Sequence, residues 1–114
     1  MYTTSLPPSP DSPGVAAAWA RGIAAAERPA RADEAEQVAR ALVDQAVQRT
    51  PAGAQIHATI TVTGDGLMIE VRDPSGVQTS DGAAWAVVSG VTSSYGTSGG
   101  PEGHTAWAEL RAAS

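Results

Sequence analysis

The stretch that decides the fold, Arg31 to Arg72, reads RADEAEQVARALVDQAVQRTPAGAQIHATITVTGDGLMIEVR. Its first half places apolar residues three or four positions apart, which is the spacing of one face of a helix. We expect this helix to begin near Ala32 or Asp33, where acidic side chains favour the helix dipole, and to end before Pro51-Ala52-Gly53. The expected buried face consists of Ala35, Val38, Ala39, Leu42, Val43, Ala46 and Val47.

The second half alternates apolar and polar residues, which is typical of strands covered on one face. We expect strands over Gln55–Thr63 and Leu67–Arg72, joined as a hairpin by the turn Gly64-Asp65-Gly66. His57 falls on the polar face with no second ligand-type residue at metal-binding spacing, so we interpret it as an ordinary exposed histidine. The inward-facing set is Ile56, Ala58, Ile60, Val62, Leu67, Ile69 and Val71.

Before this stretch, residues 1–12 are rich in Pro, Ser and Thr, and we expect a flexible tail. A short strand at Tyr2–Ser5 is the alternative. A helix should then begin with Ser12 as N-cap and Pro13 in its first turn, and end before Pro29. Its expected inward stripe is Val15, Ala18, Trp19, Gly22, Ile23 and Ala26.

After the hairpin, Asp73 to Gly76 has the composition of a turn. We expect a third helix over Gly82–Ser94, a glycine-rich link over Tyr95–Gly103 that could begin with a short strand, and a final strand over His104–Arg111. This order predicts an α+β fold, a two-layer sandwich with three helices on one face of a mostly antiparallel sheet. At 114 residues, the chain has the length of one domain, which we assign to residues 13–114.

Composition excludes several classes of function. The chain has no cysteine, which excludes disulfides and thiolate metal sites. It has no lysine, which excludes P-loop and Schiff-base chemistry. Its net charge is -5 and its arginines are scattered, which disfavours binding to nucleic acid. We find no membrane span and no signal peptide, and we expect a cytoplasmic protein.

Spacing alone gives little evidence of catalysis. Glu70 and Asp73 could form a carboxylate pair, but residues three apart on a strand point to opposite faces. No Ser, His and acid combination occurs at a recognisable spacing, so the residues do not predict general acid–base chemistry.

Four segments, in this order and spacing, carry a family resemblance. They are Ala41–Arg49, Leu67–Asp73, Gly82–Val88 and Gly103–Leu110. From Ser12 to Leu110 the chain resembles the single-domain ATP-binding modules of the Bergerat (histidine kinase-like, GHKL) fold, especially the anti-sigma-factor serine kinases of GC-rich bacteria. The first segment is similar to the family's N-box helix, Glu-Leu-Val-x-Asn-Ala-x-x-His, and the last to its final Gly-x-Thr strand.

The resemblance implies roles for particular positions. The N-box base position is Ala41, which cannot accept a proton, so we expect no catalytic residue. The magnesium-ligand position is Gln45, one methylene too long, and we expect no metal site. Gly82-Ala83-Ala84 lacks the second glycine of the phosphate loop. The adenine-binding pair is matched by Asp73 and Thr105, although Asp73 is also an ordinary turn residue.

We therefore expect a non-catalytic regulatory module on a degenerate ATP-binding fold, with no cofactor. The implied partners are a sigma factor, an anti-sigma antagonist or another signalling protein, and we expect a homodimer. One alternative is an ATP- and Mg-dependent protein serine kinase in which Glu36 or Asp44 replaces the lost base. Another is a purine sensor that uses Asp73 and Thr105 without magnesium. If any nucleotide site is retained, its residues are Gln45, Asp73, Gly82 and Thr105.

Overall fold

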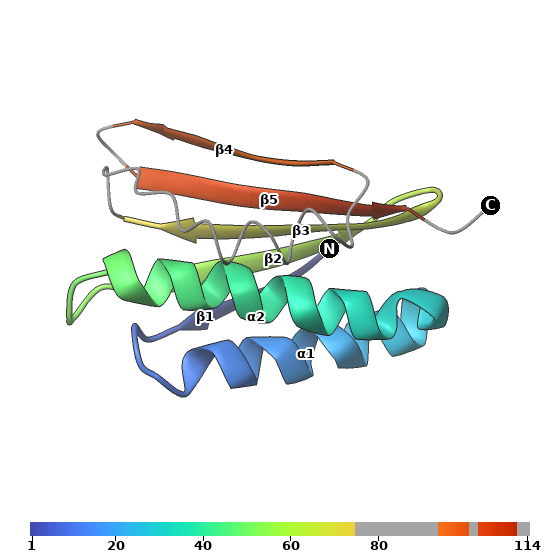
Figure 1. The fold of residues 1–114 in the computed structure, drawn as a ribbon, viewed down its shortest axis with the longest axis horizontal. Helices are drawn as coiled ribbons and strands as arrows, with labels where there is room; N and C mark the ends of the chain where they lie inside the picture. Colours follow the sequence, from blue (N-terminus) through green and yellow to red (C-terminus); the bar gives the residue numbers. More distant parts are fainter. Residues whose placement is uncertain (75–93, 101–102, 112–114) are drawn as a thin grey trace.

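The computed structural model describes residues 1–74, 94–100 and 103–111, which form two layers, with helices on one face of a sheet (Figure 1). The sheet has five antiparallel strands in the order β1-β2-β3-β5-β4. In chain order the elements are β1 (Tyr2–Leu6), α1 (Ser12–Glu27), a 3-10 turn (Pro29–Arg31), α2 (Ala32–Arg49), β2 (Ile56–Val62), β3 (Gly66–Asp73), β4 (Ser94–Gly100) and β5 (Gly103–Arg111).

This arrangement confirms the predicted α+β sandwich, with two α-helices rather than three in the described part. The third helix expected at residues 82–94 lies outside the described residues, except that Ser94 begins β4. The predicted hairpin is confirmed. Val62 pairs with Leu67, and the Thr63 amide donates to the Gly66 carbonyl at 2.9 Å.

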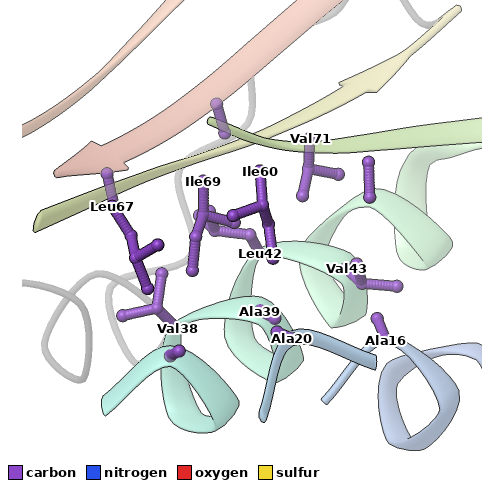
Figure 2. Packing of buried hydrophobic residues seen from close by; sticks show 14 of the residues in the cluster. Ala16, Ala20, Val38, Ala39, Leu42, Val43, Ile60, Leu67, Ile69 and Val71 are labelled. Carbon is purple, nitrogen blue, oxygen red and sulfur yellow. The ribbon is translucent and has the colours of Figure 1, made fainter. Parts of the chain in front are cut away.

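The core lies between the sheet and α2, and it consists almost entirely of aliphatic side chains and alanine (Figure 2). The strands contribute alternate residues because their side chains point to opposite faces. Leu67, Ile69 and Val71 of the central strand β3 are each at most 1% exposed, and Ile60 of β2 is fully buried. The predicted buried face of α2 is confirmed except for Val47, which is only partly buried. Neither described helix is both long and apolar enough to cross a membrane.

The predicted face of α1 is wrong. Val15 is 54% exposed, and Ala18, Gly22 and Ala26 are also exposed, whereas Ile23 is buried and Trp19 partly buried. Small residues on a neighbouring face are buried instead: Ala16, Ala17, Ala20 and Ala24. Alanines occur all round α1, so its pattern does not select one face. Figure 2 draws Ala16 and Ala20 beneath α2, on the side that carries Ala39 and Val43. The face is therefore selected by the close approach of two helices, which favours small side chains.

The first residues form the alternative strand. β1 pairs with β2 from Tyr2↔Ile60 to Leu6↔Ile56. Ser12 is not the N-cap, because α1 begins at Ser12 itself with Asp11 before it. The buried Ser12 hydroxyl instead donates to the Pro7 carbonyl at 2.5 Å, which holds the connection between β1 and α1 in place.

The glycine-rich link is an edge strand rather than a loop. β4 covers Ser94–Gly100 and pairs with β5 along its whole length. Its Gly96 lies opposite Trp107, and a β-carbon at Gly96 would be only 2.8 Å from Cζ2 of the indole. Glycine is thus needed there because the aromatic ring of β5 lies across the backbone of β4.

Candidate functional site

Three positions that matter in the resemblance lie in one line along α2. Ala41, Gln45 and Arg49 are each four residues apart, so their side chains follow one another on the same side of the helix. Ala41 is partly buried against the core, Gln45 is 2% exposed, and the Arg49 side chain is 7% exposed. This line therefore faces the protein interior rather than the solvent.

Gln45 is buried, and no hydrogen bond from the described residues satisfies its side-chain amide. Its side-chain Oε1 and Nε2 atoms are both inaccessible and have no hydrogen-bond partner among the described residues. Each unsatisfied buried polar group costs about 1–3 kcal/mol. The apolar pattern did not include Gln45, since a glutamine four residues before an arginine reads as part of the polar face of a helix. A polar group is thus kept at this position despite its cost.

Arg49, at the end of α2, joins two residues on adjacent strands. Its Nη2 atom donates to Asp73 Oδ2 at 3.0 Å and to His104 Nδ1 at 2.9 Å. The Asp73 side chain is 0% exposed and that of His104 is 2% exposed. We call these three residues the Arg49 cluster. It ties the last turn of α2 to the end of β3 and the start of β5.

The hydrogen bonding fixes the state of His104. Burial lowers the pKa of His104, and the positive charge of Arg49 lowers it further, while the Asp73 carboxylate partly offsets both. The imidazole is therefore neutral at pH 7, and its Nδ1 accepts from Arg49. Within the Arg49 cluster, the charge of Asp73 is balanced by Arg49 and not by His104.

The strand register explains why these residues meet. Asp73 on β3 is paired directly with His104 on β5, so both side chains point to the helix side of the sheet. Sequence reasoning identified Asp73 but missed both of its partners. The signal for Arg49 was its place at the end of the N-box-like segment, where the family pattern has a histidine.

Thr105 does not join Asp73. It is paired with Arg72, one position along both strands, and so it faces away from the helices. The expected adenine-binding pair is therefore split between the two faces of the sheet. Gly82, the remaining predicted contact, lies outside the described residues.

The two replacements considered for the catalytic base also lie apart from the Arg49 cluster. Glu36 accepts from Arg21 at 3.1 Å, near the start of α2 and about 20 Å along the helix from Arg49 at 1.5 Å per residue. Asp44 is exposed and accepts a hydrogen bond from Gln48 at 3.3 Å. Neither carboxylate is directed toward Asp73. In the described part of the chain, no three His, Cys, Asp or Glu side chains are grouped to hold a metal ion.

A second feature lies on the face of the sheet opposite α1 and α2. It is an open groove of about 630 Å³, which we call the outer groove. Its lining residues come from four strands, from the α2–β2 connection and from Pro74. The lining residues are Thr3, Ala54, Gln55, His57, Thr59, Glu70, Arg72, Asp73, Pro74 and Thr105. Since the Asp73 side chain is fully buried, Asp73 meets the groove through its backbone.

Comparison with known proteins finds structural likeness only. No protein-family profile and no curated protein sequence matches the chain. A structure of the RsbU and RsbW domains of Rv1364c from Mycobacterium tuberculosis matches 97% of this chain with a TM-score of 0.69 and 16% identity. The match spans 32% of that chain, so this protein corresponds to about a third of its length.

A second match is the Acinetobacter baumannii histidine kinase AdeS. It covers all of this chain and 69% of that chain, with a TM-score of 0.59 and 11% identity. At such low identity both likenesses concern the fold. They agree with the two-layer arrangement and with the resemblance of the sequence segments. The chain therefore has the histidine kinase-like (GHKL) ATPase fold.

Proposed function

We propose that this protein is a non-catalytic regulatory module that acts by binding a protein partner in sigma-factor or other signalling control. The observation that supports it most is the state of Asp73. The carboxylate that the resemblance assigns to adenine recognition is fully buried and is held by the Arg49 guanidinium at 3.0 Å. A purine amino group would have to reach a fully buried carboxylate whose Oδ2 atom already accepts a charged hydrogen bond.

The rest of the would-be nucleotide site supports the same proposal. Ala41 offers no base, and Thr105 lies on the other face of the sheet from Asp73. The position that the resemblance matches to the magnesium ligand carries the amide of Gln45, whereas Mg²⁺ is usually held by carboxylates together with phosphates and water. The described residues therefore do not fit a nucleotide–magnesium complex, and we derive no phosphoryl-transfer step.

Titration calorimetry with ATP and Mg²⁺ tests this proposal directly. We expect no heat of binding at ligand concentrations up to the millimolar range. Micromolar affinity would contradict the proposal. Arg49→Ala is the informative variant, because it removes the charged donor whose hydrogen bond Asp73 Oδ2 accepts. Nucleotide binding that appears only in this variant would identify Arg49 as the group that closes the site.

The two alternatives make different predictions in the same assays. A purine sensor would bind adenine without metal, and Asp73→Asn would abolish that binding. A kinase would transfer phosphate to a co-purified partner, and Asp44→Ala or Glu36→Ala would stop the transfer. We expect neither result.

The partner and the assembly belong to the proposal as well. We propose a cytoplasmic protein whose partner is a sigma factor, an anti-sigma antagonist or a related signalling protein, and which forms a homodimer. Affinity capture from native extract would identify the partner, and light scattering after size-exclusion chromatography would measure the assembly. A strictly monomeric protein at high micromolar concentration would contradict the homodimer.

A further inference from the structure

The outer groove carries charge in two neighbouring rows. Across the strands, Thr3, Thr59 and Glu70 form one row, because each is the register partner of the next. His57, Arg72 and Thr105 form the next row in the same way. One row thus carries a carboxylate and the other a guanidinium, and the two lie about 7 Å apart, the span of two strand residues.

These two charges do not neutralise each other. Within the described part of the chain, neither Glu70 nor Arg72 takes part in a salt bridge or a side-chain hydrogen bond. Arg72 leans toward the far end of β3, since its Nε atom lies 3.9 Å from where a β-carbon of Gly103 would be. Glu70 is only partly exposed, and no cation of the described residues forms a salt bridge with it. Both residues line the same groove, where a ligand could supply the opposite charges.

The groove also supplies neutral hydrogen-bonding groups. His57 shares a hydrogen bond of 3.0 Å with Ser5 through Nδ1, which leaves its Nε2 atom for another partner. Threonine hydroxyls from β1, β2 and β5 can both donate and accept. The row that contains Arg72 therefore suits an acidic group of a ligand, and the row that contains Glu70 suits a basic group.

We propose that the outer groove binds an extended segment of the protein partner that carries one basic and one acidic side chain two residues apart. This rests on the proposed function as a protein-binding module. In an extended peptide, side chains two residues apart point the same way and are about 7 Å apart, which matches the spacing of Glu70 and Arg72 on β3. The groove is open and about 630 Å³ in volume, which suits a short segment rather than a globular surface.

The probe is a capped pentapeptide, Ala-Lys-Thr-Glu-Ala, titrated into the isotopically labelled full chain and followed by amide NMR shifts. The matched control peptide is Ala-Gln-Thr-Gln-Ala. We expect concentration-dependent shifts on β2, β3 and β5 with the charged peptide and none with the neutral one. Equal binding of the neutral peptide, or the absence of shifts with the charged peptide, would overturn the proposal.

Charge reversal tests the residues themselves. Glu70→Arg or Arg72→Glu alone should weaken the charged peptide by about tenfold or more, because each places like charges together. The double variant E70R/R72E should recover most of the affinity, since an extended peptide can bind in the opposite direction. Arg40→Glu, an exposed site on α2, is the control and should change nothing. Single reversals that bind like the wild type would overturn the proposal.

Two checks keep the outcome interpretable. Circular dichroism confirms that each variant is folded, and Glu70→Gln replaces Glu70→Arg if the reversal unfolds the chain. Failure of the peptide test with no ATP binding removes only the groove as the binding surface. Binding of ATP and Mg²⁺ removes the proposed function whatever the peptides do.

Discussion

The end of β3 and the start of β5 place very different side-chain environments on the two faces of the sheet. On β3, Arg72 and Asp73 are neighbours, and on β5, His104 and Thr105 are neighbours, yet alternation sends one member of each pair to each face. The helix-side pair is buried and bound by Arg49. The outer pair lines an open groove with its charge unsatisfied among the described residues. We therefore expect the first face to matter more for stability, and we propose that the second face binds the partner.

The largest expected effect comes from breaking the Arg49 cluster. Arg49→Ala leaves the Asp73 carboxylate buried without its cation, and we expect a loss of about 3–5 kcal/mol in the free energy of unfolding. Urea denaturation followed by circular dichroism measures it. The double variant Arg49→Met/Asp73→Leu should recover most of the loss, because no charge is left buried. A single Arg49→Ala variant as stable as the wild type would show that the cluster adds nothing to stability.

Gln45 offers a change in the opposite direction. Gln45→Leu replaces a buried, unsatisfied amide by an apolar group of similar size, and we expect the free energy of unfolding to rise by about 1–2 kcal/mol. The matched control is Gln48→Leu, three residues on and exposed, which should change stability by less than about 0.5 kcal/mol. If Gln45→Leu destabilises the protein, the amide has a partner that outweighs its cost of burial.

His104 makes stability depend on pH. The pKa of His104 in the folded state is lowered from the ordinary value of 6.5, which we take for the unfolded chain. At a pH between the folded and the unfolded pKa, His104 is protonated in the unfolded chain and neutral in the folded protein. Stability should therefore fall as the pH drops below about 6.5, by no more than about 1.4 kcal/mol per pH unit for one proton. His104→Gln should reduce this slope in denaturation curves from pH 7 to pH 5. An unchanged slope would assign the pH dependence to other groups.

The smallest effect is expected on the outer face. Arg72→Ala removes an exposed charge next to Asp73 along the chain, and we expect less than about 0.5 kcal/mol of change in the free energy of unfolding. The same denaturation assay as for Arg49→Ala provides the comparison. A loss as large as that of Arg49→Ala would mean that the two faces do not differ in the way described.

Sequence periodicity predicted the parts of the fold in which one face clearly differs from the other. The α2 helix and the β2–β3 hairpin were found because Leu, Val and Ile mark their buried sides. The α1 helix was predicted, but its buried face was wrong, because alanine occurs on all its sides and packing against α2 selected the face. Only a short strand was considered at the start of the β4 segment, because glycine, its commonest residue, is typical of loops. Gly96 is there to accommodate Trp107.

The candidate site shows a similar limit. Family-like spacing identified Asp73, because the strand before it has a clear pattern. The pairing of Asp73 with His104 rather than Thr105 depends on the register between β3 and β5, and a shift of one residue exchanges the faces of every side chain. Register is set by three-dimensional packing across distant strands. The burial of Gln45 could not be predicted for the same reason, since the helix pattern does not show how closely α2 packs against the sheet.

The pairing of β1 with β2 has a consequence for how the chain folds. Residues 2–6 pair with residues 56–60, so β1 is synthesised long before its partner exists. The α1–α2 pair and the β2–β3 hairpin need only contacts between neighbours in the chain and can form early, whereas closing the long loop to β1 is slow. We expect β1 to join the sheet late, and mutations in it to accelerate unfolding far more than they slow folding.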